Sequence, residues 1–123
     1  MQKVPSISEA EWEVMKVVWA KSPCTSSQII DVLDENKDWN PKTIKTLINR
    51  LVNKNILGFK KDGRRYLYYS LIEQSECIRA ENQSFLSRVY DGAIKSMLVN
   101  FIKENDLSNE DIDDLKNILN ERK

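Results

Sequence analysis

A helix with a clear N-terminal capping signal, followed directly by a β-hairpin, restricts the fold more than any other feature of this chain. Asn40 is a good helix N-cap, and Pro41 suits the first helical position, where its missing N–H costs nothing. Apolar residues then recur at i, i+3, i+4 and i+7, which predicts a helix running to about Lys54 with one buried face. The residues of that face are Ile44, Leu47, Ile48 and Leu51.

Two short runs of aromatic and apolar residues, 57–61 and 66–70, come next. Asp62-Gly63 lies between them and is a strong signal for a β-hairpin. The second run is rich in tyrosine, which could provide a stacking platform for single-stranded nucleic acid. We expect instead that most of these rings pack in the core, because alternate residues of a strand pack on the helices and tyrosine is a good strand former. They are Tyr66, Tyr68 and Tyr69.

Two further helices precede the helix that starts at Pro41. Ser8 and Glu11 have the spacing of a capping box, and the helix they open ends before Pro23. Thr25 or Ser26 can cap a second, short helix. Three helices followed by a hairpin are typical of a winged helix-turn-helix domain, so residues 1–72 are predicted to be mainly α with a small β-hairpin wing.

The neutral net charge of the chain conceals a basic segment. The chain has 19 Lys and Arg against 19 Asp and Glu, but residues 42–65 contain a single acid, Asp62. Basic charge concentrated on one helix and hairpin is expected of a surface that contacts phosphates. The cations of this segment are Lys42, Lys45, Arg50, Lys54, Lys60, Lys61, Arg64 and Arg65.

The polar residues of the predicted third helix lie opposite its apolar face, which suits a recognition helix in double-stranded DNA. Such a helix reads bases mainly with its N-terminal residues, so the major-groove contacts are assigned to Lys42, Thr43, Lys45 and Thr46. Asn49 and Arg50 are assigned mainly to the DNA backbone. The wing would contact the neighbouring backbone with Lys60, Lys61, Arg64 and Arg65. The alternative is an ordinary solvated helix face, and the added cations of the hairpin favour DNA.

Residues 73–123 are predicted to be a helical dimerisation domain. They contain three amphipathic helices with more apolar surface than so short a segment can bury. Pairing with a second copy would present two recognition helices to a palindromic operator; the alternative is that these helices fold back on their own winged helix. The residues assigned to the dimer contact are Phe85, Val89, Met97, Leu98, Phe101, Ile112, Leu115 and Leu119.

Composition argues against several other classes of protein. The chain has no histidine and only three glycines, which disfavours an enzyme, and no metal or cofactor is predicted. Cys24 and Cys77 are far apart, which argues against a disulfide framework or a thiolate metal site. No apolar run has the length of a membrane span, and Met1–Pro5 lacks the apolar stretch of a signal peptide, so the expected location is cytoplasmic.

Several motifs, in this order, resemble the penicillinase and methicillin repressor family (BlaI/MecI). They lie at residues 7–15, 40–47, 49–51, 84–86, 89–90, 98–101 and 114–119. The resemblance implies a cytoplasmic dimer that represses β-lactamase or β-lactam-resistance genes. It also implies cleavage in the dimerisation region after a membrane sensor is acylated by a β-lactam, and the family's Asn-Phe cleavage site corresponds to Asn100-Phe101. Copper-responsive members of a related branch have paired CxC motifs, which this chain lacks.

Three alternatives to a β-lactam-resistance repressor remain at the level of sequence. The chain could regulate another operon through the same winged helix. It could be a protein-interaction adaptor, although an adaptor would more often have an apolar patch where the third helix is basic. It could also be a thiol-redox regulator, which would need an exposed cysteine thiolate of low pKa.

Overall fold

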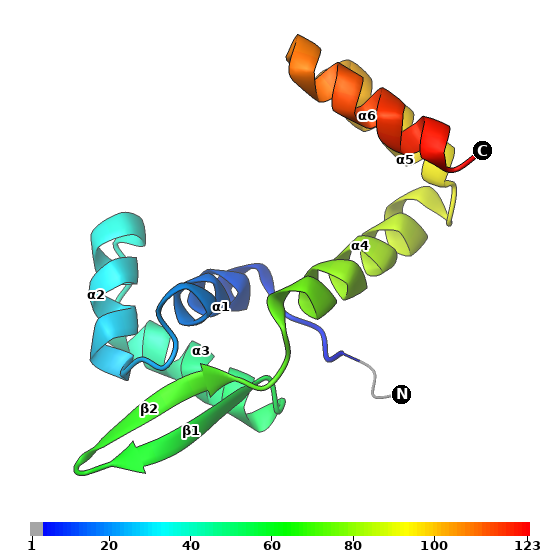
Figure 1. Cartoon of the computed structure of the whole chain (residues 1–123). Coiled ribbons are helices and arrows are strands. Elements are labelled where there is room, and N and C mark those ends of the chain that lie inside the picture. Colours follow the sequence, from blue (N-terminus) through cyan, green and yellow to red (C-terminus); the bar gives the residue numbers. More distant parts are fainter. Residues whose placement is uncertain (1–3) are drawn as a thin grey trace. The chain divides into compact units, whose positions relative to one another are not determined.

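The computed structural model describes residues 4–123, except for the side chain of Asn36. Met1–Lys3, which belong to the segment without the apolar stretch of a signal peptide, lie outside the described residues. Two compact units are present, one up to Glu81 and one from Asn82 (Figure 1). Within the described residues, no helix is both long and apolar enough to cross a membrane. The helices are α1 (Glu9–Lys21), α2 (Ser26–Lys37), α3 (Pro41–Asn53), α4 (Gln74–Tyr90), α5 (Ile94–Glu104) and α6 (Asn109–Glu121), and the strands are β1 (Leu57–Asp62) and β2 (Arg65–Ser70).

The helix starts of the first unit are those that the sequence predicts. Ser8 and Glu11 form a reciprocal capping box at α1. Thr25, rather than Ser26, caps α2 and forms a second capping box with Gln28. At α3 the side chain of Asn40 accepts a hydrogen bond from the backbone N–H of Lys42 at 2.8 Å. Each cap satisfies N–H groups that a helix end would otherwise leave without a partner.

The core of the first unit lies between the three helices and the root of the hairpin. The four residues of the predicted apolar face of α3 are all buried. They pack with Val14, Met15 and Val18 of α1 and with Ile29 and Leu33 of α2. Trp12 and Trp19 are half-buried and pack against this core. Their rings lie 5.5 Å apart.

The hairpin is confirmed, but its turn lies one residue later than Asp62-Gly63. Asp62 pairs with Arg65, so the two turn residues are Gly63 and Arg64. Gly63 has a φ of +66° and is the first central residue, as in a type II′ turn, where glycine avoids the steric cost of a left-handed backbone. Figure 1 shows the hairpin extending from the helices as a wing.

The prediction that most wing tyrosines lie in the core is wrong. Tyr66 is 45% exposed and Tyr69 is 38% exposed, while Tyr68 is half-buried. Tyr68 is held at the root by two backbone hydrogen bonds with Cys24, of 2.7 and 3.1 Å. Successive strand residues face opposite sides, so Tyr69 turns away from the core. Tyr66 shares the side of Tyr68 but lies nearer the tip, where it packs edge-on against Phe59 at 5.1 Å.

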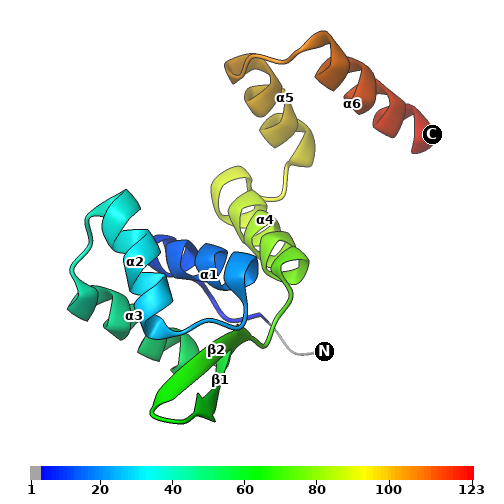
Figure 2. The same ribbon diagram turned by 60° about the vertical axis from the view of Figure 1, so that its left-hand side comes forward.

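The second unit contains the end of α4 together with α5 and α6. α4 ends at Tyr90 and is followed by Asp91 and Gly92, both at positive φ. Ser108 opens α6 through a capping box with Asp111. Figure 2 shows α5 and α6 diverging from the loop that joins them. No residue from Asn82 onward is buried. The helices of this unit therefore expose the apolar faces that the sequence leads us to expect.

Candidate nucleic-acid interface

The outward face of α3 carries the six residues of this helix that the sequence assigns to DNA. Every one of them is exposed, whereas the opposite face of the helix is buried. The hydroxyl of Thr46 donates to the backbone carbonyl of Lys42 at 3.0 Å. Its methyl group and oxygen lone pairs remain available to a ligand. The six residues are Lys42, Thr43, Lys45, Thr46, Asn49 and Arg50.

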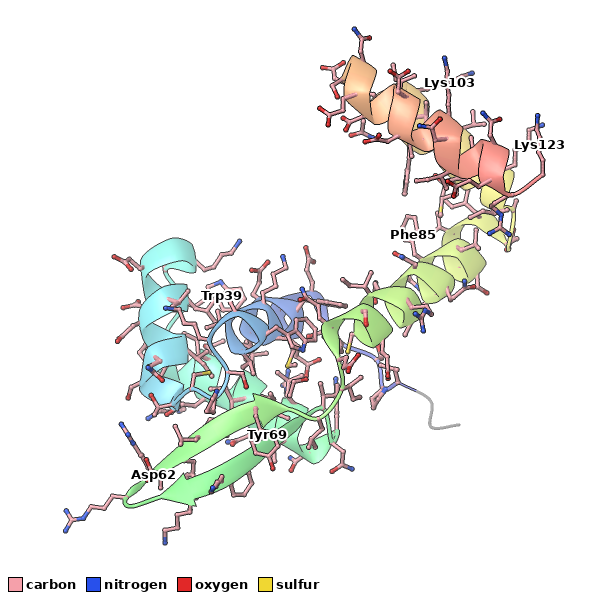
Figure 3. All side chains as sticks on the ribbon, viewed as in Figure 1. Trp39, Asp62, Tyr69, Phe85, Lys103 and Lys123 are labelled. Carbon is pink, nitrogen blue, oxygen red and sulfur yellow. The ribbon has the colours of Figure 1, made fainter. Side chains whose placement is uncertain are left out.

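The wing adds four exposed cations close to its tip. Arg64 lies in the turn itself, and the side chain of Arg65 pairs with Asp62 at 3.2 Å. Figure 3 shows Asp62 at the far end of the hairpin. The strand register places Lys61 on the side of Phe59 and Tyr66, and Lys60 on the opposite side. The wing therefore presents positive charge on both sides and at its end.

Two adjoining hollows connect α3 with the wing. One has a volume of about 230 Å³ and includes Lys45 and Asn49 of α3. The other has a volume of about 310 Å³ and includes Arg64 and Tyr66 of the wing. Both are bordered by Tyr68 and by the start of α2, so helix and wing lie on the same basic surface. The residues from the start of α2 are Thr25, Ser26 and Ser27.

Sequence reasoning did not assign Ser26, Ser27 or Tyr66 to this surface. The signal for the two serines was present, because hydroxyl residues at a helix start carry donors next to unpaired backbone N–H groups. Nothing in the sequence showed that the wing would bring Tyr66 alongside them. That placement depends on the long-range backbone pairing between Cys24 and Tyr68.

Lys54 belongs to the basic segment by sequence but is engaged elsewhere. Its ammonium group lies 2.7 Å from a carboxylate oxygen of Glu11, which is 1% exposed. Burial raises the pKa of Glu11. Hydrogen bonds from Lys54 and from the backbone and hydroxyl of Ser8, together with the charge of Lys54, outweigh burial and hold that pKa below its ordinary value. Seven cations of the segment therefore remain for the outward surface.

Both cysteines are buried free thiols in the first unit. Burial, the larger effect on each, raises the pKa of Cys24 and of Cys77. A redox regulator needs the opposite, an exposed thiolate of low pKa. Among the described residues there is no cluster of acidic residues and cysteines able to hold a metal ion.

The residues assigned to dimerisation and cleavage lie in the second unit. Phe85 and Met97 are half-buried, and the other assigned apolar residues are exposed. Phe101 contacts the rings of Phe85 and Tyr90, with centroids 6.0 and 6.5 Å away. The Asn100-Phe101 bond lies within α5 rather than in a loop.

Comparison with known proteins identifies the family. Residues 7–121 match the family model described as penicillinase repressor. The chain belongs to the penicillinase repressor family. It is 42% identical over 120 residues to the methicillin resistance regulatory protein MecI of Staphylococcus aureus (strain N315), covering 98% of each chain. It is also 42% identical over 123 residues to the penicillinase repressor of Bacillus licheniformis, covering 100% of this chain and 96% of that one.

Solved structures of the family agree with the fold described above. The DNA-binding domain of the repressor BlaI matches with a TM-score of 0.56 and 42% identity, over 62% of this chain and 93% of that one. Monomeric B. licheniformis BlaI in complex with the blaP half-operator matches with a TM-score of 0.55 and the same identity and coverage. The predicted fold, mainly α with a winged-helix wing, is thus confirmed, and the protein is a repressor of the DNA-binding type.

Proposed function

We propose that this penicillinase repressor family protein binds a palindromic operator of β-lactamase or β-lactam-resistance genes as a homodimer and is inactivated by cleavage in its second unit. The observation that carries the proposal is the continuous basic surface formed by α3, the wing and the start of α2. Seven exposed cations lie on α3 and the wing, and the hydroxyl side chains of Thr25, Ser26 and Ser27 border its hollows. The relative BlaI was solved with a half-operator, which supports operator DNA as the ligand.

The base contacts are proposed for the first half of α3. Lys42 and Lys45 can donate to guanine acceptors in the major groove. Thr46 already donates its hydroxyl hydrogen within the helix, so it would offer the groove an acceptor and a methyl group. That pair of features suits the amino group of adenine or cytosine and the methyl group of thymine. Lys42, Thr43, Lys45 and Thr46 would therefore set the sequence preference.

Backbone contacts are proposed for the flanks of this surface. Asn49 and Arg50 lie later on α3, and the wing cations reach beyond the helix on the far side of the hollows. Ser26 and Ser27 would hydrogen-bond phosphate oxygens from the start of α2, a common position for such contacts. These contacts orient the protein without selecting a base sequence.

A homodimer is proposed because the second unit leaves large apolar side chains uncovered. Val89, Phe101, Ile118 and Leu119 are each between 46 and 58% exposed. So many large apolar side chains left exposed in one unit suggest an interaction site. In a symmetric dimer, each copy would cover the exposed apolar side chains of the other, and two copies of α3 would be available to a palindrome.

Cleavage is proposed at Asn100-Phe101, on the basis of family resemblance. The bond is in helical conformation, and the carbonyl of Phe101 accepts a hydrogen bond from Asn105 at 2.7 Å. A protease would reach it only after local opening of α5. The cut would remove Phe101 and all of α6 from the dimer contact, so paired operator binding would be lost. A cytoplasmic location and a link to a membrane β-lactam sensor are part of the same proposal.

Chemical-shift mapping tests the interface directly. The ¹⁵N-labelled full chain would be titrated with the blaP half-operator duplex that BlaI binds. We expect the largest shifts at the outward face of α3, the wing tip and Ser26-Ser27, and small shifts on the α1 face around Lys16. Shifts centred on α1, or none at all, would exclude this surface as the DNA interface.

A further inference from the structure

A buried carboxylate joins the start of α1 to the end of α3. Glu11 is the one charged residue buried in the described part of the chain. One of its carboxylate oxygens accepts from the ammonium of Lys54 at 2.7 Å and from the backbone N–H of Ser8 at 2.8 Å. The same ammonium donates to the carbonyl of Ser6 at 2.9 Å. The single side-chain nitrogen of Lys54 thus binds both Ser6, before α1, and Glu11, in the first turn of α1.

Lys54 occupies the joint from which both DNA-contacting elements extend. It is the C-cap residue of α3, and Asn55 follows at a φ of +61°. The backbone N–H of Ile56 then donates to the carbonyl of Leu51 at 3.0 Å, and β1 begins at Leu57. The recognition helix therefore ends, and the wing begins, within four residues of the ion pair.

We propose that Lys54 is a positioning residue for operator binding, which holds the end of α3 against Glu11 and so fixes the direction of the recognition helix relative to the wing. This inference rests on the proposed operator binding. An apolar pair could fill the same space, because a buried ion pair seldom adds net stability over well-packed apolar residues. What the ion pair adds is a defined geometry, since the ammonium must reach Glu11 and Ser6 together.

Lys54 differs from the cations proposed to contact phosphate, because its ammonium group is already bound to Glu11 and Ser6. Its side chain is 35% exposed, against 66% for Arg65 at the wing tip. A phosphate contact would require it to leave Glu11, and the buried carboxylate would then lose its only cationic partner among the described residues. Lys54 should therefore influence operator affinity without contributing to counterion release.

The test uses Lys54→Met in the full chain, with Lys16→Met as a matched control that removes an exposed cation from α1. Binding to a palindromic operator duplex and to a scrambled duplex would be measured over a range of salt at a temperature where circular dichroism shows each variant folded. We expect Lys54→Met to lose operator affinity on the order of tenfold, as one mismatched base pair does. Its salt slope should match that of the wild type, and Lys16→Met should change neither quantity.

The double variant Glu11→Gln/Lys54→Met separates positioning from folding. Removing both charges should restore much of the thermal stability lost in Lys54→Met, while operator affinity stays low. Residual dipolar couplings of the free proteins should show a changed angle between α3 and β1 in both variants. Unchanged couplings would overturn the inference whatever the measured operator affinities are. An operator affinity equal to that of the wild type in the double variant would also overturn it. A salt slope reduced by about 0.9 per chain would instead make Lys54 a phosphate contact. If the wild type itself fails to prefer the operator, the proposed function fails, and the couplings still decide the positioning role.

Discussion

Shortening Leu119 should weaken the proposed dimer by an amount that follows from its exposure. Complete burial of a leucine side chain is worth about 1.5–3 kcal/mol. Because 58% of Leu119 remains uncovered in the single chain, covering it in a dimer is worth about 1–1.7 kcal/mol. Two-fold symmetry counts this contact twice, so Leu119→Ala should cost about 2–3.4 kcal/mol, or about 30- to 300-fold in the dimer dissociation constant.

Sedimentation equilibrium over a concentration series measures that constant. Leu71→Ala is a matched control, because Leu71 is 52% exposed but belongs to the first unit; it should leave the dimer unchanged. Both variants should keep the helix content of the wild type. A dissociation constant for Leu119→Ala within twofold of the wild-type value would refute the reasoning that a second copy covers α6.

Four further substitutions test the DNA contacts, the buried carboxylate and a helix cap. Lys42→Ala should lower the ratio of operator to scrambled affinity, whereas Arg64→Ala should weaken both equally and reduce the salt slope by about 0.9 per chain; equal loss on every sequence for both variants in anisotropy titrations contradicts these roles. In urea denaturation between pH 2 and 6, the free energy of unfolding should fall less steeply with decreasing pH for Glu11→Gln than for the wild type. The pKa of Glu11 is lowered in the folded state, so its contribution to stability is present above the ordinary glutamate pKa and disappears as pH falls through the folded value. An equally steep fall in both proteins would argue against this contribution. Ser108→Ala should destabilise α6 by about 1 kcal/mol, seen as faster amide exchange in its first turn, and unchanged exchange would mean that the cap contributes nothing.

Local sequence signals were sufficient for the helices and for most of the candidate site. A capping residue fixes a helix start through hydrogen bonds within three residues, so Ser8, Asn40 and Ser108 could each be recognised without knowledge of the fold. The buried face of α3 followed from its spacing, and the exposed face followed from that. These features depend on contacts close in the sequence.

The features that sequence reasoning missed depend on distant contacts. Tyr66 was placed in the core because strand alternation says which residues share a side, but not how far the strand extends beyond the helices. Lys54 was counted with the surface cations because its partner, Glu11, lies 43 residues away. The turn was misplaced by one residue because Gly63 fits either of two turn types, and only the strand register distinguishes them.

A fluorescence-anisotropy titration of the full chain measures operator binding and its sequence preference. One duplex would carry a palindromic β-lactamase-type operator and the other a scrambled sequence of equal length, each at two salt concentrations. The account predicts that the palindrome binds at least about a thousandfold more tightly, with two chains per duplex and a steep loss of affinity at the higher salt. Weak binding of equal strength to both duplexes would contradict it.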